Sequence, residues 1–98
     1  MKIKFLYAKK PNYMMTRKDA KFLFLEDLVT KYDKVFDGEL DVEDQDDVFR
    51  IFNSDDENPL VPNQKPYPYS HTSMSVSDIV VIDNTLNVCL PSGWYSLK

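Results

Sequence analysis

Two side chains in this sequence, His71 and Cys89, could act together as a base and a nucleophile. Such catalysis needs a thiolate, a neighbouring histidine that accepts its proton, and a third group that orients the histidine. The sequence offers no evident third group, and a cysteine on a strand face is usually a small core side chain. We therefore expect Cys89 to be structural and the protein not to be an enzyme.

Carboxylates are the second chemical feature, with ten of them between residues 37 and 57. Calcium loops place Asp at alternate positions before a Gly, and neither acidic segment follows that pattern, so we expect no metal and no cofactor. The acids either form a solvated face that keeps the protein soluble or imitate DNA phosphates in front of a basic partner protein. The surface that would contact such a partner consists of Asp41, Glu43, Asp44, Asp46, Asp47, Asp55, Asp56 and Glu57.

Charge is distributed unevenly along the chain. Residues 1–34 carry nine Lys or Arg against four Asp or Glu, whereas residues 35–98 carry three against twelve. Phosphate contacts need clustered cations, so the net charge of −4 argues against nucleic acid as the main partner. A direct nucleic-acid contact could involve only the basic stretch from residue 9 to residue 21.

Features that would place the chain in or across a membrane are missing from the sequence. The longest apolar runs are too short to span a bilayer, and the N-terminus does not resemble a signal peptide. The single cysteine cannot form an internal disulfide. We therefore expect a cytoplasmic protein without membrane association.

The last third of the chain predicts an antiparallel meander. Three apolar runs, at residues 79–82, 86–90 and 94–97, are separated by the turn signals Asp83-Asn84-Thr85 and Pro91-Ser92-Gly93. The first run is apolar on both faces, which predicts a central strand. Asp78 precedes it and is expected to accept backbone N–H bonds that hold the turn.

The upstream segments must cover or extend this sheet. Alternation predicts a strand at residues 2–8, and a second strand is expected at 34–41 with a bulge at Gly38. Thr16 and Asp19 resemble a capping box that starts a helix over residues 17–30, although residues 22–25 also suit a buried strand. A shorter helix follows the acidic run, with Val48, Phe49 and Phe52 on one face and Asn53 at its end.

These elements predict one α+β domain over residues 1–98, with two helices covering an antiparallel sheet. Residues 54–70 are acidic and contain four prolines, which predicts a long loop. The expected core contains Trp94, Phe49, Phe52, Ile79 and Val81.

Several short motifs resemble a group of small phage and plasmid proteins that includes the YodL-like domains. They are the helix Asp46-Asp47-Val48-Phe49-Arg50-Ile51-Phe52-Asn53, the turn Ser73-Met74-Ser75-Val76-Ser77-Asp78, and the C-terminal Gly93-Trp94-Tyr95. The resemblance covers roughly residues 32–98, and residues 1–9 fit the group's opening strand. Many members carry Gly where Ser77 stands, so we expect this turn to avoid a positive φ. The acidic, proline-rich insert at residues 55–69 is particular to this chain.

The resemblance implies a viral or mobile-element origin and transfers no catalytic residue. Together with the acidic second half, it leads us to expect an accessory protein of the host cytoplasm. Such a protein would bind a basic surface on a host protein and inhibit a defence or transcription enzyme. The alternative is a structural or regulatory protein that forms a homo-oligomer through an exposed sheet edge, with the acids serving only solubility.

Overall fold

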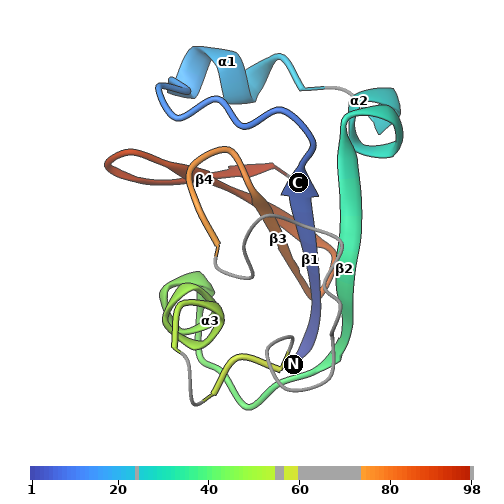
Figure 1. Cartoon of the computed structure of the whole chain (residues 1–98), viewed down its shortest axis with the longest axis vertical. Coiled ribbons are helices and arrows are strands. Elements are labelled where there is room, and N and C mark those ends of the chain that lie inside the picture. Colours follow the sequence, from blue (N-terminus) through green and yellow to red (C-terminus); the bar gives the residue numbers. More distant parts are fainter. Residues whose placement is uncertain (24, 55–56, 60–73, 98) are drawn as a thin grey trace.

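The computed structural model describes residues 1–23, 25–54, 57–59 and 74–97, and its centre is a five-stranded antiparallel sheet. The strands lie in the order β2-β1-β3-β4-β5, and Figure 1 labels the first four of them. Their bounds are β1 Lys2–Ala8, β2 Tyr32–Glu39, β3 Ile79–Ile82, β4 Thr85–Leu90 and β5 Gly93–Leu97. The predicted meander and the central position of its first strand are confirmed.

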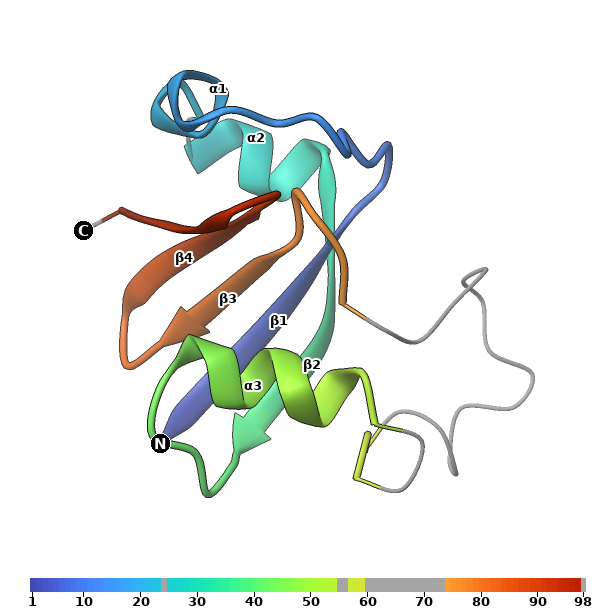
Figure 2. The same cartoon turned by 90° about the vertical axis from the view of Figure 1, so that its left-hand side faces the viewer.

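Three short helices, α1 Arg17–Lys21, α2 Leu25–Thr30 and α3 Gln45–Phe52, accompany this sheet. α3 lies across one end of the strands and α1 and α2 lie at the other end (Figure 2). The α+β class is therefore confirmed, although the described residues form three helices where the sequence predicted two. Most of the predicted 54–70 loop lies outside the described residues.

Alternation along β1 divides the core between the two faces of the sheet. Ile3, Phe5 and Tyr7 are buried in one hydrophobic cluster with α3, while Leu6 and Ala8 pack against a second cluster that includes residues of α1 and α2. The side chains of β3 alternate between the two clusters in the same way, because successive side chains of a strand point to opposite faces of the sheet. Both faces are therefore covered, which agrees with the apolar character of the central strand.

The predicted continuous helix over residues 17–30 is wrong, since α1 ends at Lys21 and α2 begins at Leu25. Its start is confirmed: the Thr16 hydroxyl accepts from the Asp19 N–H, and the Asp19 carboxylate accepts from the Thr16 N–H. Leu23 and Leu28 both pack against the second cluster. In one helix they would point about 140° apart, so the break allows both to reach the sheet.

The second strand begins and ends two residues earlier than predicted, and the expected bulge is not at Gly38. Phe5 pairs with Phe36 and Leu6 with Lys34, so the extra residue on β2 is Val35. Gly38 instead pairs in register with Ile3. A Cβ added to Gly38 would lie 3.2 Å from the Phe36 ring, which is a physical reason for a small residue there.

The predicted core is only partly correct. Phe52 and Ile79 are fully buried, but Trp94 and Val81 are half-buried and Phe49 is 37% exposed. α3 turns Val48, Ile51 and Phe52 toward the sheet, which is the i, i+3, i+4 spacing of one helix face. Phe49 lies off that face and points toward β5.

The Ser75–Asp78 turn joins several distant segments. The buried Asp78 carboxylate accepts hydrogen bonds from the N–H groups of Ala8 and Ser75, both at 2.9 Å. The Ser77 N–H donates to the Cys89 carbonyl, and the Cys89 N–H donates to the Asp78 carbonyl. The role expected for Asp78 is confirmed, and its partners lie at the end of β1 and within the turn.

Ser77 contradicts the expectation that its turn avoids positive φ, because its φ is 78°. The side chain offsets part of this strain: its hydroxyl accepts from the Asn12 N–H at 3.0 Å. Its carbonyl also accepts from the Tyr32 hydroxyl at 2.8 Å. The hydroxyl bond depends on the serine side chain and would be lost with glycine, whereas the carbonyl bond uses the backbone and would remain.

Comparing Ser77→Gly with Ser77→Ala separates the strain from the hydrogen bond. Both variants lose the Asn12 contact, but only glycine adopts the left-handed φ without a Cβ penalty. We expect the free energy of unfolding of Ser77→Gly to be about 1 kcal/mol higher than that of Ser77→Ala and close to that of the native chain. Urea unfolding of the three proteins measures this, and an alanine variant as stable as the glycine variant would contradict it.

Candidate functional site

The carboxylates between residues 41 and 47 lie just before α3 or in its first turn, and three of them have structural partners. Asp44 is the N-cap residue, and its Oδ1 accepts from the Asp47 N–H at 3.0 Å. Asp47 Oδ2 in turn accepts from the Glu43 N–H at 2.9 Å. These bonds satisfy donors at a helix start, where carboxylates also interact favourably with the helix dipole.

Asp46 links this helix start to the end of the sheet. Its Oδ1 accepts from the indole N–H of Trp94 on β5 at 2.8 Å. The bond orients the half-buried Trp94 ring, which also packs against the first hydrophobic cluster. Asp46 therefore has a specific contact that sequence reasoning did not foresee.

An aromatic pair lies beside these carboxylates. The rings of Phe49 and Trp94 meet edge to face, with centroids 6.3 Å apart. They line a shallow hollow of about 160 Å³ together with Asp46, Cys89, Leu90 and Gly93. An aromatic pair of which one ring is exposed and the other half-buried, next to a carboxylate, can accept a cationic side chain through charge and cation–π attraction.

Not all of the remaining predicted acids lie near the start of α3. Asp41 and Glu43 are exposed near the start of α3. Glu57 lies beyond the end of the helix and pairs with Arg50, with Nη1 and Oε2 2.6 Å apart. Asp55 and Asp56 lie outside the described residues, as does His71. The structure therefore brings together Asp41, Glu43, Asp44, Asp46 and Asp47, which we call the acidic face.

Cys89 is buried, with 5% of its surface exposed. Burial raises the pKa of its thiol to about 11, and the negative charges of Asp78 and Asp46 act in the same direction. Little thiolate forms at neutral pH, which is the opposite of what a nucleophile needs. These properties agree with a structural cysteine.

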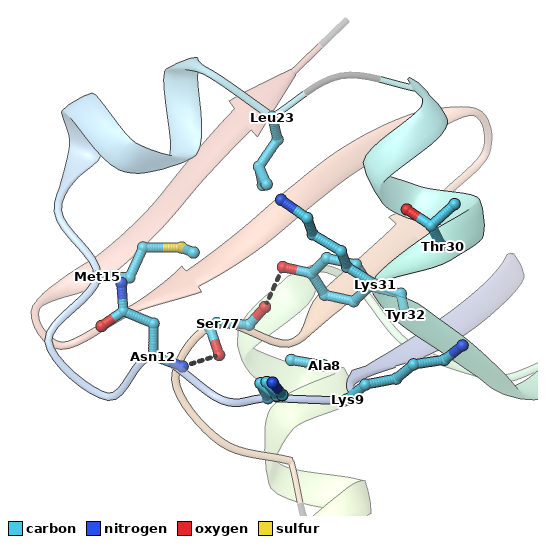
Figure 3. Close-up of a pocket in the computed structure, with 10 residues that line it drawn as sticks. Ala8, Lys9, Asn12, Met15, Leu23, Thr30, Lys31, Tyr32 and Ser77 are labelled. Carbon is cyan, nitrogen blue, oxygen red and sulfur yellow. Dashed lines mark hydrogen bonds between the residues drawn. The ribbon is translucent and has the colours of Figure 1, made fainter.

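A second cavity was not anticipated from the sequence. It has a volume of about 440 Å³ and lies between the loop after β1, the turn at Ser77 and the junction of α2 with β2. Met15, Leu23 and Tyr32 contribute apolar surface, and the lysines 9, 10 and 31 also line it. Figure 3 shows Met15, Leu23 and Lys31 directed toward the same space. The sequence indicated only the basic stretch near the N-terminus, and several other residues that line the cavity come from segments farther along the chain.

Among the described residues, no group of three or more His, Cys, Asp or Glu side chains is arranged to hold a metal ion. No helix within the same part of the chain is long and apolar enough to cross a membrane.

A family model described as YodL-like domain matches residues 9–90. No curated protein and no solved structure matches the chain.

Proposed function

We propose that this chain, which belongs to the YodL-like domain family, binds a basic surface on another protein through its acidic face. The observation that carries the proposal is the exposed Phe49, held edge-on to Trp94 beside Asp46. Protein interfaces concentrate their binding energy in such aromatic residues, and surrounding polar groups exclude water from them. A lysine or arginine of the partner would contact the rings and the carboxylates together.

The partner we propose is a host protein, because the resemblance to phage and plasmid proteins implies action inside a host cell. The acidic face would steer association by long-range attraction and would occupy positions that otherwise receive phosphates. The aromatic pair adds an apolar contact that a DNA backbone lacks. Inhibition of a DNA-handling enzyme is the activity that this combination supports best.

Self-association through a sheet edge is the competing proposal. The two edge strands are β2 and β5. β2 carries Asp33, Lys34, Asp37 and Glu39, and charged side chains of this kind oppose pairing with another strand. β5 is only five residues long. These features favour the acidic face.

The charge of the acidic face can be removed while its hydrogen bonds remain. Asparagine has a side-chain oxygen that can cap a helix and accept from an indole N–H, so Asp44, Asp46 and Asp47 can become Asn without loss of those roles. We expect the triple variant to fold normally and to lose its partner. Phe49→Ser should weaken the same complex, since Phe49 is exposed and its replacement leaves the core intact.

Capture from host lysate by the native chain, followed by purification of the captured protein and titration, measures this. We expect binding at low salt and loss of binding near 0.5 M salt, where the Debye length falls to about 4 Å. A triple variant Glu26→Gln, Asp33→Asn and Asp37→Asn changes the net charge equally, on α2 and β2, and should still bind. A partner that survives both high salt and the acidic-face substitutions would contradict the proposal. A mass that rises with concentration, without any partner, would support self-association instead.

A further inference from the structure

The cavity lined by lysines 9, 10 and 31 has the dimensions of a small-molecule site. Its volume of about 440 Å³ lies within the range of ligand pockets, which is about 300–1,000 Å³. Met15 and Tyr32 are buried and Leu23 is half-buried, so its inner surface is largely apolar. The three lysines are exposed and lie where the cavity meets solvent.

The base of the cavity is fixed by hydrogen bonds. The Tyr32 hydroxyl donates to the Ser77 carbonyl at 2.8 Å, and the Asn12 N–H donates to the Ser77 hydroxyl at 3.0 Å, as Figure 3 shows. Burial raises the pKa of Tyr32 to about 12, and Asp78 and Asp27 act in the same direction, so this donor keeps its proton at neutral pH. The cavity is therefore formed before any ligand arrives, which lowers the entropic cost of binding.

Charge at the opening favours a ligand with one negative charge. Lys31 pairs with Asp27 at 3.2 Å and Lys9 lies 3.9 Å from Asp33, whereas Lys10 has no ion pair among the described residues. Three cations against two carboxylates leave one net positive charge. The Asp78 carboxylate is buried, accepts from the N–H groups of Ala8 and Ser75, and does not line the cavity.

We propose that this cavity binds a small amphipathic monoanion, namely a carboxylate with an aliphatic or aromatic body. The apolar body lies against Met15, Leu23 and Tyr32, where it leaves water. The carboxylate lies between Lys10 and Lys31, whose ammonium groups donate charge-assisted hydrogen bonds to it. The site is separate from the acidic face, so it does not depend on the function proposed above.

Four probes with matched parts test the inference: octanoate, octanol, octylammonium and acetate. Octanoate should bind the native chain saturably, below the concentration at which it forms micelles. The accompanying NMR shifts should be confined to the backbone amides around Ala8, Asn12, Lys31 and Ser77. Octanol should bind more weakly, and octylammonium and acetate should not bind. Equal binding of octanol or octylammonium would overturn the proposal, as would acetate binding as well as octanoate or no saturable binding of octanoate.

Two double variants locate the anion. Lys10→Met with Lys31→Met keeps the apolar stems and removes both ammonium groups, and we expect octanoate affinity to fall at least about tenfold. Lys2→Met with Lys4→Met removes the same charge at the other end of β1 and should leave affinity unchanged. All four positions are exposed, so both proteins should fold. An equal loss in the two variants would mean general electrostatic attraction and would refute the site.

Discussion

Replacing Asp78 by alanine is expected to lower the free energy of unfolding by about 2–5 kcal/mol, because each buried polar group left without a partner costs about 1–3 kcal/mol. The carboxylate is 1% exposed and accepts from the N–H groups of Ala8 and Ser75. Alanine leaves both donors, which belong to half-buried residues, without this acceptor. Because native stability is usually about 5–15 kcal/mol, this loss is a large part of the total.

A matched control is available in the next turn along the chain. Asp83 also accepts a backbone N–H from β1, that of Lys2 at 3.1 Å, but it is exposed. Asp78→Asn should remove one of the two acceptor oxygens and destabilise the protein clearly, whereas Asp83→Asn should cost less than about 1 kcal/mol, as exposed positions usually do. Urea unfolding monitored through Trp94 measures all three variants. An Asp78→Ala protein as stable as Asp83→Asn would show that the buried carboxylate does not hold the turn.

The sequence predicted Asp78 and the meander correctly because their signals are local. Apolar runs of strand length lie between residues that form turns, and Asp83 and Asn84 both adopt the positive φ that short hairpins need. The Thr16–Asp19 capping box was visible for the same reason, since its two hydrogen bonds join residues three apart. Local patterns of this kind depend little on the rest of the fold.

The wrong predictions for Ser77 and for the helix over residues 17–30 result from contacts between distant parts of the chain. Ser77 takes a positive φ because hydrogen bonds from Asn12 and Tyr32, both more than forty residues away, hold its hydroxyl and carbonyl. The helix over residues 17–30 breaks where Leu23 and Leu28 must both reach the second cluster. No local pattern contains either constraint.

The two candidate sites also differ in how far apart their residues lie in the sequence. The five carboxylates of the acidic face lie within seven positions of the sequence, so their closeness could be predicted. The bond from the Trp94 indole to Asp46 spans forty-eight positions and could not. The lysine-lined cavity combines the segments around residues 8–15, 23, 30–32 and 77. Only the folded chain brings these segments together.

The second large effect is expected from Phe52→Ala, which should cost about 3–5 kcal/mol of unfolding free energy. Phe52 is fully buried, and its ring meets those of Phe5 and Phe36 edge to face, with centroids 4.6 and 5.4 Å away. These rings join α3 to β1 and β2 across the first cluster. Truncation leaves a cavity that the close-packed sheet cannot fill by relaxation.

Phe49 provides the comparison within the same helix. Replacing Phe49 by alanine removes the same side chain from the same helix as Phe52→Ala does. Phe49 is 37% exposed, however, and its ring meets that of Trp94 on the edge strand β5. Phe49→Ala should therefore cost about 1 kcal/mol, in the range of ordinary single substitutions. Chemical denaturation of both variants gives the difference directly. Equal losses would mean that α3 is rotated about its axis, with Phe49 buried as the sequence pattern first indicated, and the aromatic contact proposed for the acidic face would then be unavailable to a partner.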